Sequence, residues 1–143
     1  MMVTADALLG AWTLREWRVE VAGSGRTAWP FGPDASGLLV YAPAGWMSAT
    51  LSQRARTPLS ATSARQADER SRALAMSEYL AYTARWSIES GILVHVIVLS
   101  LNPVLIGTRQ VRTASFQGND LVLAATETVG GDRRTHRLAW QRA

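Results

Sequence analysis

His95 is the residue whose surroundings are most unusual for its type. It lies in the middle of residues 92–99, where every other side chain is aliphatic. The chain has only two histidines and no cysteine, so few other side chains can move protons near neutral pH. Two interpretations stay open at this point: His95 is a hydrogen-bonded core residue, or it is an acid or base inside an apolar binding site.

Gln110 and Arg112 are polar residues on a strand face that alternation predicts to be inward and otherwise apolar. A buried arginine must be paired or hydrogen-bonded. Its partner is either a protein carboxylate, such as Glu16 or Glu127, or an oxygen atom of a bound ligand. In the second case, Arg112 and Gln110 form a clamp for a carbonyl or carboxylate group.

The same alternation places Tyr82 and Trp86 on the inward face of residues 79–89. It groups His95 with Leu93, Ile97 and Leu99 on the inward face of the next strand. These patterns predict a catalytic set and a ligand-binding set. The catalytic set is His95, Tyr82 and Arg112, and the ligand-binding set is Tyr41, Trp46, Met47, Trp86, Ile97 and Gln110.

Tyr41 and Trp46 flank an Ala-Pro-Ala-Gly turn, which makes them expected cross-strand neighbours. They either line the mouth of a cavity or form an ordinary aromatic pair that stabilises a hairpin. Met47 alternates with them and is expected in the core or in the cavity wall, because methionine adapts to irregular shapes.

The elements that must position these side chains are short strands separated by turns rich in glycine, proline and asparagine. Eight strands joined mostly by hairpins predict an all-β fold, a single antiparallel up-and-down barrel with an internal apolar cavity large enough for one small ligand. The expected strands are residues 11–21, 37–41, 46–52, 79–89, 92–101, 108–116, 121–127 and 134–141.

One short helix is expected over residues 62–76, capped by Thr or Ser and lying outside the barrel across one end. Two prolines and a glycine in residues 29–34 forbid a regular strand there, while Trp29 and Phe31 need apolar cover. This segment is therefore expected to form a loop over a barrel end, where it could act as a lid. We expect one domain over residues 1–143.

Composition excludes several function classes. All fifteen basic residues are arginines, so chemistry that needs a lysine amine is ruled out. The arginines are scattered, which argues against nucleic acid as a partner. With two histidines and no cysteine, neither a metal site nor a cofactor is expected. The longest apolar segment is too short to span a bilayer, and the start shows no leader, so a cytoplasmic monomer or homodimer is expected, not membrane-bound.

A glycine and a tryptophan stand two residues apart at the start of the first strand, as Leu9-Gly10-Ala11-Trp12. Related features follow along the chain at residues 29–34, 39–41, 45–49, Tyr82, 85–86, His95, 100–101, Pro103, 107–108, 110–112 and 138–142. Together these residues resemble the bacterial lipocalin-like domain family over nearly the whole chain. The resemblance implies a small β-barrel with a pocket, and some members occur in natural-product biosynthesis.

Three departures from the family pattern are informative. The family usually has a second histidine after His95, an acidic residue two positions further on, and an Asn-Trp pair after the proline. Here those positions hold Val96, Val98 and Val104-Leu105. Each change removes a polar group, which favours a more apolar ligand or an apolar packing partner.

Three functions are compatible with these features. The first is a cofactor-independent cyclase or isomerase that folds a hydrophobic, polyketide- or terpenoid-like intermediate inside the barrel. The second is a carrier that binds a hydrophobic small molecule without chemistry. The third is a dimeric interaction module whose apolar strand forms the interface.

Overall fold

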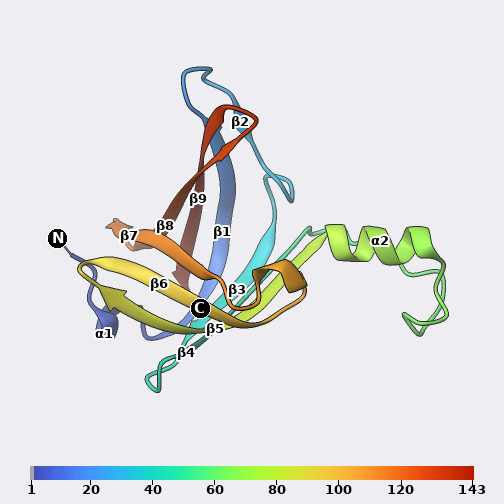
Figure 1. Cartoon of the computed structure of the whole chain (residues 1–143), viewed down its shortest axis with the longest axis horizontal. Helices are drawn as coiled ribbons and strands as arrows, with labels where there is room; N and C mark the ends of the chain where they lie inside the picture. The colour runs from blue at the N-terminus through green and yellow to red at the C-terminus, as the bar shows by residue number, and fades with distance from the viewer. Residues whose placement is uncertain (1) are drawn as a thin grey trace.

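The computed structural model of the chain describes residues 2–143 and consists mainly of antiparallel β-strands (Figure 1). The boundaries agree with the expected strands to within about two residues at most ends, because turn residues separate the apolar runs. The strands are β1 (Gly10–Val21), β2 (Thr27–Ala28), β3 (Ser36–Tyr41), β4 (Trp46–Ser52), β5 (Tyr79–Glu89), β6 (Ile92–Ser100), β7 (Arg109–Gln117), β8 (Asp120–Val129) and β9 (Asp132–Arg142).

Eight of these strands close into a barrel. From β3 to β9 each strand pairs with the next one in the sequence. Strand β1 pairs with β3 on one side and with β9 on the other, from Trp12 opposite Arg142 to Val21 opposite Arg134. The two-residue β2 is an appendage on the end of β1. The predicted eight-stranded up-and-down barrel is confirmed.

One end of the barrel is closed by residues from both chain termini. Trp12 is almost completely buried, and its indole N–H donates to the carbonyl of Leu8 at 2.9 Å. The guanidinium of Arg142 lies over the Trp12 ring, 4.1 Å from its centre, and donates to the carbonyls of Ala7 and Leu9. Gly10 has a φ of +111°, and a Cβ there would lie 3.0 Å from Arg142, so this position requires glycine.

A β-bulge in β6 changes which side chains face inward. Ala84 pairs with Ile97 and Thr83 pairs with Leu99, so Val98 has no partner of its own. Because one extra residue reverses the alternation, Leu99 lies on the outer face and is 64% exposed. The expectation that Leu99 shares the inward face with His95 is wrong, whereas Leu93 and Ile97 are buried as expected.

The hairpin between β3 and β4 also differs from expectation by one residue. Tyr41 pairs with Met47, and the hydrogen bond from the N–H of Ala42 to the carbonyl of Trp46 closes the turn. Trp46 therefore lies on the outer surface, where the guanidinium of Arg85 covers its ring. The predicted cross-strand pairing of Tyr41 with Trp46 is wrong, since the turn is one residue shorter than supposed.

The helices are short. The first turn, α1 (Ala5–Leu8), is capped by Thr4, and a 3₁₀ turn, η1 (Pro103–Leu105), joins β6 to β7. The longer helix, α2 (Glu69–Ser77), begins after Asp68, whose carboxylate accepts from the N–H of Ser71. It starts seven residues later than expected because Asp68 provides the cap. It extends away from the barrel instead of crossing its end (Figure 1).

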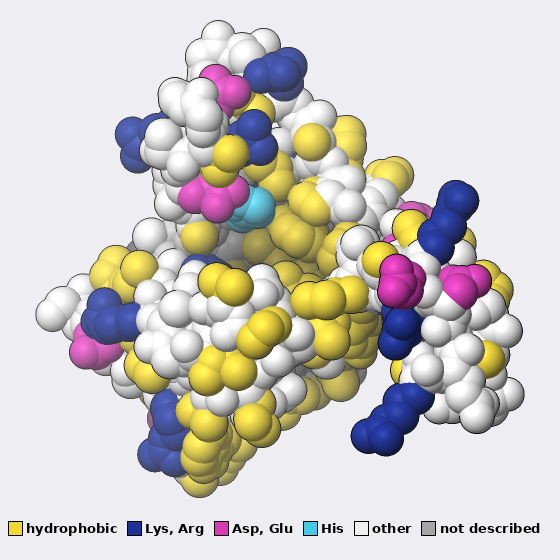
Figure 2. Space-filling model, turned by 45° about the vertical axis from the view of Figure 1, so that its right-hand side comes forward, with side chains coloured by type: hydrophobic (Ala, Val, Ile, Leu, Met, Phe, Trp, Pro, Cys, Tyr) yellow, Lys and Arg dark blue, Asp and Glu magenta, His cyan; other side chains and the backbone are white. Residues whose placement is uncertain are grey.

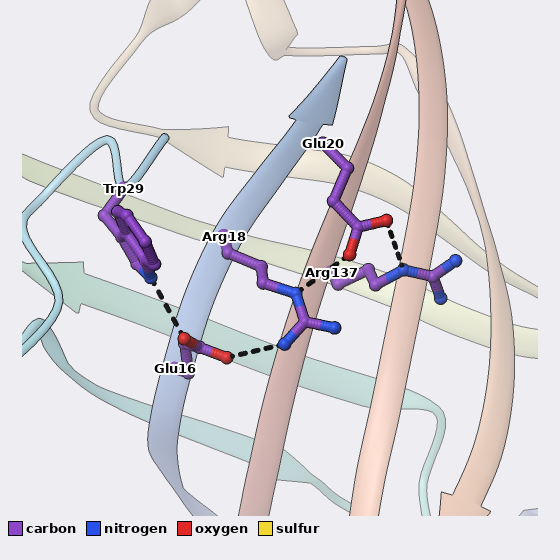
Figure 3. A network of polar contacts seen from close by, with 5 residues as sticks. All are labelled: Glu16, Arg18, Glu20, Trp29 and Arg137. Carbon is purple, nitrogen blue, oxygen red and sulfur yellow. Dashed lines mark hydrogen bonds and ion pairs between the residues drawn. The ribbon is translucent and has the colours of Figure 1, made fainter. Parts of the chain in front are cut away.

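A polar network on the outside of β1 and β9 anchors the loop formed by residues 29–34 (Figure 3). Glu16 accepts hydrogen bonds from Arg18 and from the indole of Trp29, at 3.1 and 3.0 Å. The loop also inserts Phe31, which is buried edge-on against Trp17 with 5.0 Å between ring centres. A lid function for this loop stays a prediction.

Candidate functional site

The interior of the barrel contains a cavity of about 340 Å³. This volume lies within the range of small-molecule sites, which begins near 300 Å³. Figure 2 shows the molecule hollowed, with apolar side chains gathered around the hollow. The apolar lining includes Leu39, Leu51, Ile97, Leu123 and Leu138.

His95 lies in the wall of this cavity between two tyrosines. Its Nε2 is 2.8 Å from the hydroxyl of Tyr41, and its Nδ1 is 2.8 Å from the hydroxyl of Tyr82. His95 and Tyr41 are each only 1% exposed. Tyr82 and His95 both line the cavity, whereas Tyr41 lies behind them. Strands β3, β5 and β6 thus bring together a hydrogen-bonded chain, Tyr41 to His95 to Tyr82.

The surroundings of the three hydrogen-bonded side chains, Tyr41, His95 and Tyr82, keep all of them uncharged. Burial, with a further contribution from the positive charge of Arg112, lowers the pKa of the His95 imidazole from 6.5 to about 3. Burial raises the pKa of the Tyr41 phenol well above its usual range. Burial also raises the pKa of the Tyr82 phenol, although the nearby guanidinium of Arg112 opposes that rise. At neutral pH the imidazole is neutral and both phenols are protonated.

Hydrogen-bond satisfaction assigns the tautomer of His95. Among residues 2–143, the imidazole is the only hydrogen-bond partner of the buried Tyr41 hydroxyl. A buried hydroxyl that did not donate would cost about 1–3 kcal/mol, so Tyr41 donates to Nε2. The neutral ring then carries its proton on Nδ1 and donates to the oxygen of Tyr82. The O–H of Tyr82 is left free to donate to a ligand in the cavity.

Arg112 lines the cavity from β7 without a carboxylate partner. Its guanidinium donates to the carbonyl of Val111 at 2.9 Å. Within residues 2–143 no acidic side chain forms an ion pair with it: Glu16 pairs with Arg18, and Glu127 contacts His136. Arg112 therefore forms no ion pair with Glu16 or Glu127, and it is half-buried, not buried as expected. Its role as a partner for a ligand oxygen stays a prediction.

A further donor lies in the cavity wall at Trp140. This residue is 1% exposed, and its indole N–H has no acceptor among residues 2–143. A buried donor without a partner costs free energy, and this nitrogen has almost no accessible surface, so it is not a contact point for a ligand. The donors that an otherwise apolar cavity offers to a ligand are therefore Arg112 and Tyr82.

The remaining predicted ligand-binding residues divide into three groups. Ile97 and Gln110 line the cavity, and Gln110 donates to the hydroxyl of Thr108 at 2.9 Å. Met47 and Trp86, like Tyr41, pack in the core around the cavity wall without lining it. Trp46 is 41% exposed on the outer surface. The functional roles of all these residues stay predictions.

The cavity also contains aromatic and charged residues that are absent from the predicted site, among them Trp17, Glu127, His136 and Trp140. His136 shares strand parity with Leu138 and Trp140 on β9, which was the available signal. The imidazole of His136 contacts Glu127 at 2.9 Å through Nε2 and accepts from the indole of Trp17 at 3.2 Å through Nδ1. The cavity thus holds both of the chain's histidines.

Within residues 2–143, no cluster of three or more His, Cys, Asp or Glu side chains is placed to hold a metal ion. No helix among these residues is long and apolar enough to cross a membrane.

A family model for a lipocalin-like domain matches residues 9–143. The chain belongs to the lipocalin-like domain family. Neither the curated proteins nor the solved structures compared with the chain gave a match. A lipocalin-like barrel with an apolar internal cavity is suited to binding a small hydrophobic molecule.

Proposed function

We propose that this lipocalin-like protein is a cofactor-independent cyclase or isomerase that acts on a hydrophobic, polyketide- or terpenoid-like intermediate bound inside the barrel. The observation that carries the proposal is the guanidinium of Arg112, which has no carboxylate partner among residues 2–143, beside the hydroxyl of Tyr82 in an apolar cavity. A purely apolar cargo would leave the O–H of Tyr82 without an acceptor and would offer none to the guanidinium N–H groups that do not donate to Val111, whereas a carbonyl oxygen accepts from both residues.

The chemistry follows from where these donors lie. A carbonyl oxygen held by Arg112 and Tyr82 is polarised, and negative charge that develops on it in a transition state is stabilised. The Tyr41 to His95 to Tyr82 chain holds the Tyr82 hydroxyl in place and polarises it. His95 is then a positioning residue, since an imidazole with a pKa of about 3 is a weak base. The apolar wall folds the remainder of the substrate.

The alternative is a non-catalytic carrier of a hydrophobic small molecule. It uses the same cavity and the same donors, because they bind a ketone whether or not it reacts. The two functions differ only in whether bonds at the carbon next to the carbonyl are made or broken.

Exchange of carbon-bound protons tests this difference. The probe is 2-tetralone, an apolar ketone, with binding followed by quenching of tryptophan fluorescence and exchange followed by ¹H NMR in D₂O. The proposal predicts that the protein accelerates exchange and that Tyr82→Phe lowers kcat/KM by about 10²-fold, typical for the loss of one such donor. Arg112→Gln is expected to act in the same direction. Binding of 2-tetralone with exchange no faster than in buffer would favour the carrier.

A further inference from the structure

Glu127 and His136 form a second polar group in the cavity wall, on strands β8 and β9. The donors Arg112 and Tyr82 come from other strands, β7 and β5. The interior therefore combines donors from one set of strands with a carboxylate from another. Figure 2 shows a histidine and acidic side chains beside the apolar hollow.

Trp17 determines how this second group is hydrogen-bonded. An indole N–H can only donate, so Nδ1 of His136, 3.2 Å away, is the acceptor. The neutral imidazole then carries its proton on Nε2 and donates it to Oε1 of Glu127 at 2.9 Å. Trp17 is itself packed against the buried Phe31, so His136 and Glu127 are held from two sides.

The second carboxylate oxygen of Glu127 has no partner. Among residues 2–143, Oε2 of Glu127 takes part in no hydrogen bond or ion pair. Its cross-strand neighbour, Arg134, forms no ion pair with it either. The structure thus offers an oriented, half-exposed carboxylate that lines the cavity and has one oxygen not bonded to protein, which is the requirement for a general base.

We infer that Glu127 is the general base of the site, oriented by His136 and Trp17, and that the substrate is an enolisable ketone. This inference rests on the proposed function. Glu127 removes a proton from the carbon next to the carbonyl. As that C–H bond breaks, its electron pair moves to the carbonyl oxygen, and the enolate is held by Arg112 and Tyr82.

The proton on Glu127 then completes the reaction without any oxidant or reductant. In an isomerisation it returns to a different carbon of the same molecule. In a cyclisation the enolate carbon forms a bond to a second carbonyl carbon of the substrate, and the proton passes to the new alkoxide. A hydrocarbon substrate that reacts through a carbocation has no carbonyl oxygen to accept from Arg112 and Tyr82. The substrate class narrows to polyketide-like compounds with more than one carbonyl.

Glu127→Gln is the decisive variant, because it keeps the shape and removes the basic carboxylate. Glu20→Gln is the matched control: the Glu20 side chain is 40% exposed against 51% for Glu127, and neither it nor its partners Arg18 and Arg137 line the cavity. Two probes are used. One is exchange of 2-tetralone in D₂O. The other is 5-nitrobenzisoxazole, in which removal of a carbon-bound proton breaks the N–O bond and releases a coloured phenolate.

The inference predicts that Glu127→Gln lowers the protein-catalysed rate with both probes on the order of 10²-fold, while Glu20→Gln matches the wild type. Circular dichroism confirms that each variant is folded. If Tyr82→Phe loses exchange but Glu127→Gln keeps it, Glu127 is not the base, although the proposed function stands. If the wild type binds 2-tetralone without accelerating exchange, the proposed function and this inference both fail.

Discussion

The two histidines of this barrel line the same cavity and differ in nearly every physical property. His95 is 1% exposed, lies between two phenols, and has a pKa lowered to about 3. The side chain of His136 is 25% exposed and lies between an indole and a carboxylate. Partners and burial, not residue type, therefore decide what a histidine can do. The first orients a donor, and the second orients an acceptor.

The largest expected effect is at His95, and it is a loss of folding stability in acid. The pKa of His95 is 6.5 in the unfolded chain and about 3 in the barrel, so the unfolded state binds its proton first as the pH falls. The contribution of the neutral His95 to the free energy of unfolding is fully present above pH 6.5. It is lost progressively toward pH 3, by roughly 5 kcal/mol in total. Denaturant unfolding at several pH values measures this loss.

The window from pH 6.5 to about 5 is the most useful, since carboxylates titrate mainly below it. The wild type should lose about 1 kcal/mol per pH unit there on average, and His95→Gln should flatten this slope. A His95→Gln slope equal to that of the wild type would show that His95 accepts a proton in the folded barrel.

Removal of the Tyr41 hydroxyl tests the inner end of the hydrogen-bonded chain. Tyr41→Phe leaves Nε2 of His95 without its donor in a buried place, which should cost about 1–3 kcal/mol of stability. Exchange of 2-tetralone should fall less than in Tyr82→Phe, because Tyr41 does not line the cavity. Equal losses of activity in the two variants would mean that Tyr41 contacts the ligand directly.

The smallest effect is expected at His136. His136→Gln keeps an amide N–H that can donate to Glu127, and the position is partly exposed. The free energy of unfolding should therefore change by about 1 kcal/mol or less. A loss as large as that of Tyr41→Phe would show that the hydrogen-bonded pair of His136 and Glu127 stabilises the fold as much as the buried contact between Tyr41 and His95 does.

The sequence predicted the fold well because its signals were local. Turn residues marked the strand ends, and alternation identified the inward faces of Tyr82 and His95. The eight-stranded barrel follows from these two signals with the family resemblance. The position of α2 did not follow, because Asp68 competes as a cap with the Thr and Ser residues before it.

The site was harder to predict because it depends on register and on contacts distant in sequence. The bulge at Val98 turns Leu99 outward, and nothing in an aliphatic run marks which residue is extra. The shorter turn puts Trp46 on the surface in the same way. The contact of His136 with Trp17 joins residues from the two ends of the chain, which only closure of the barrel brings together.

The tautomers of the two histidines test the account most directly. In a long-range ¹H–¹⁵N spectrum of the labelled protein at neutral pH, the ring nitrogens that carry protons are distinguished by their shifts. The account predicts opposite neutral tautomers, with the proton on Nδ1 in His95 and on Nε2 in His136. A proton on Nε2 of His95 would mean that the Tyr82 hydroxyl donates to the imidazole instead of to the cavity, which contradicts its role as the donor to a bound carbonyl.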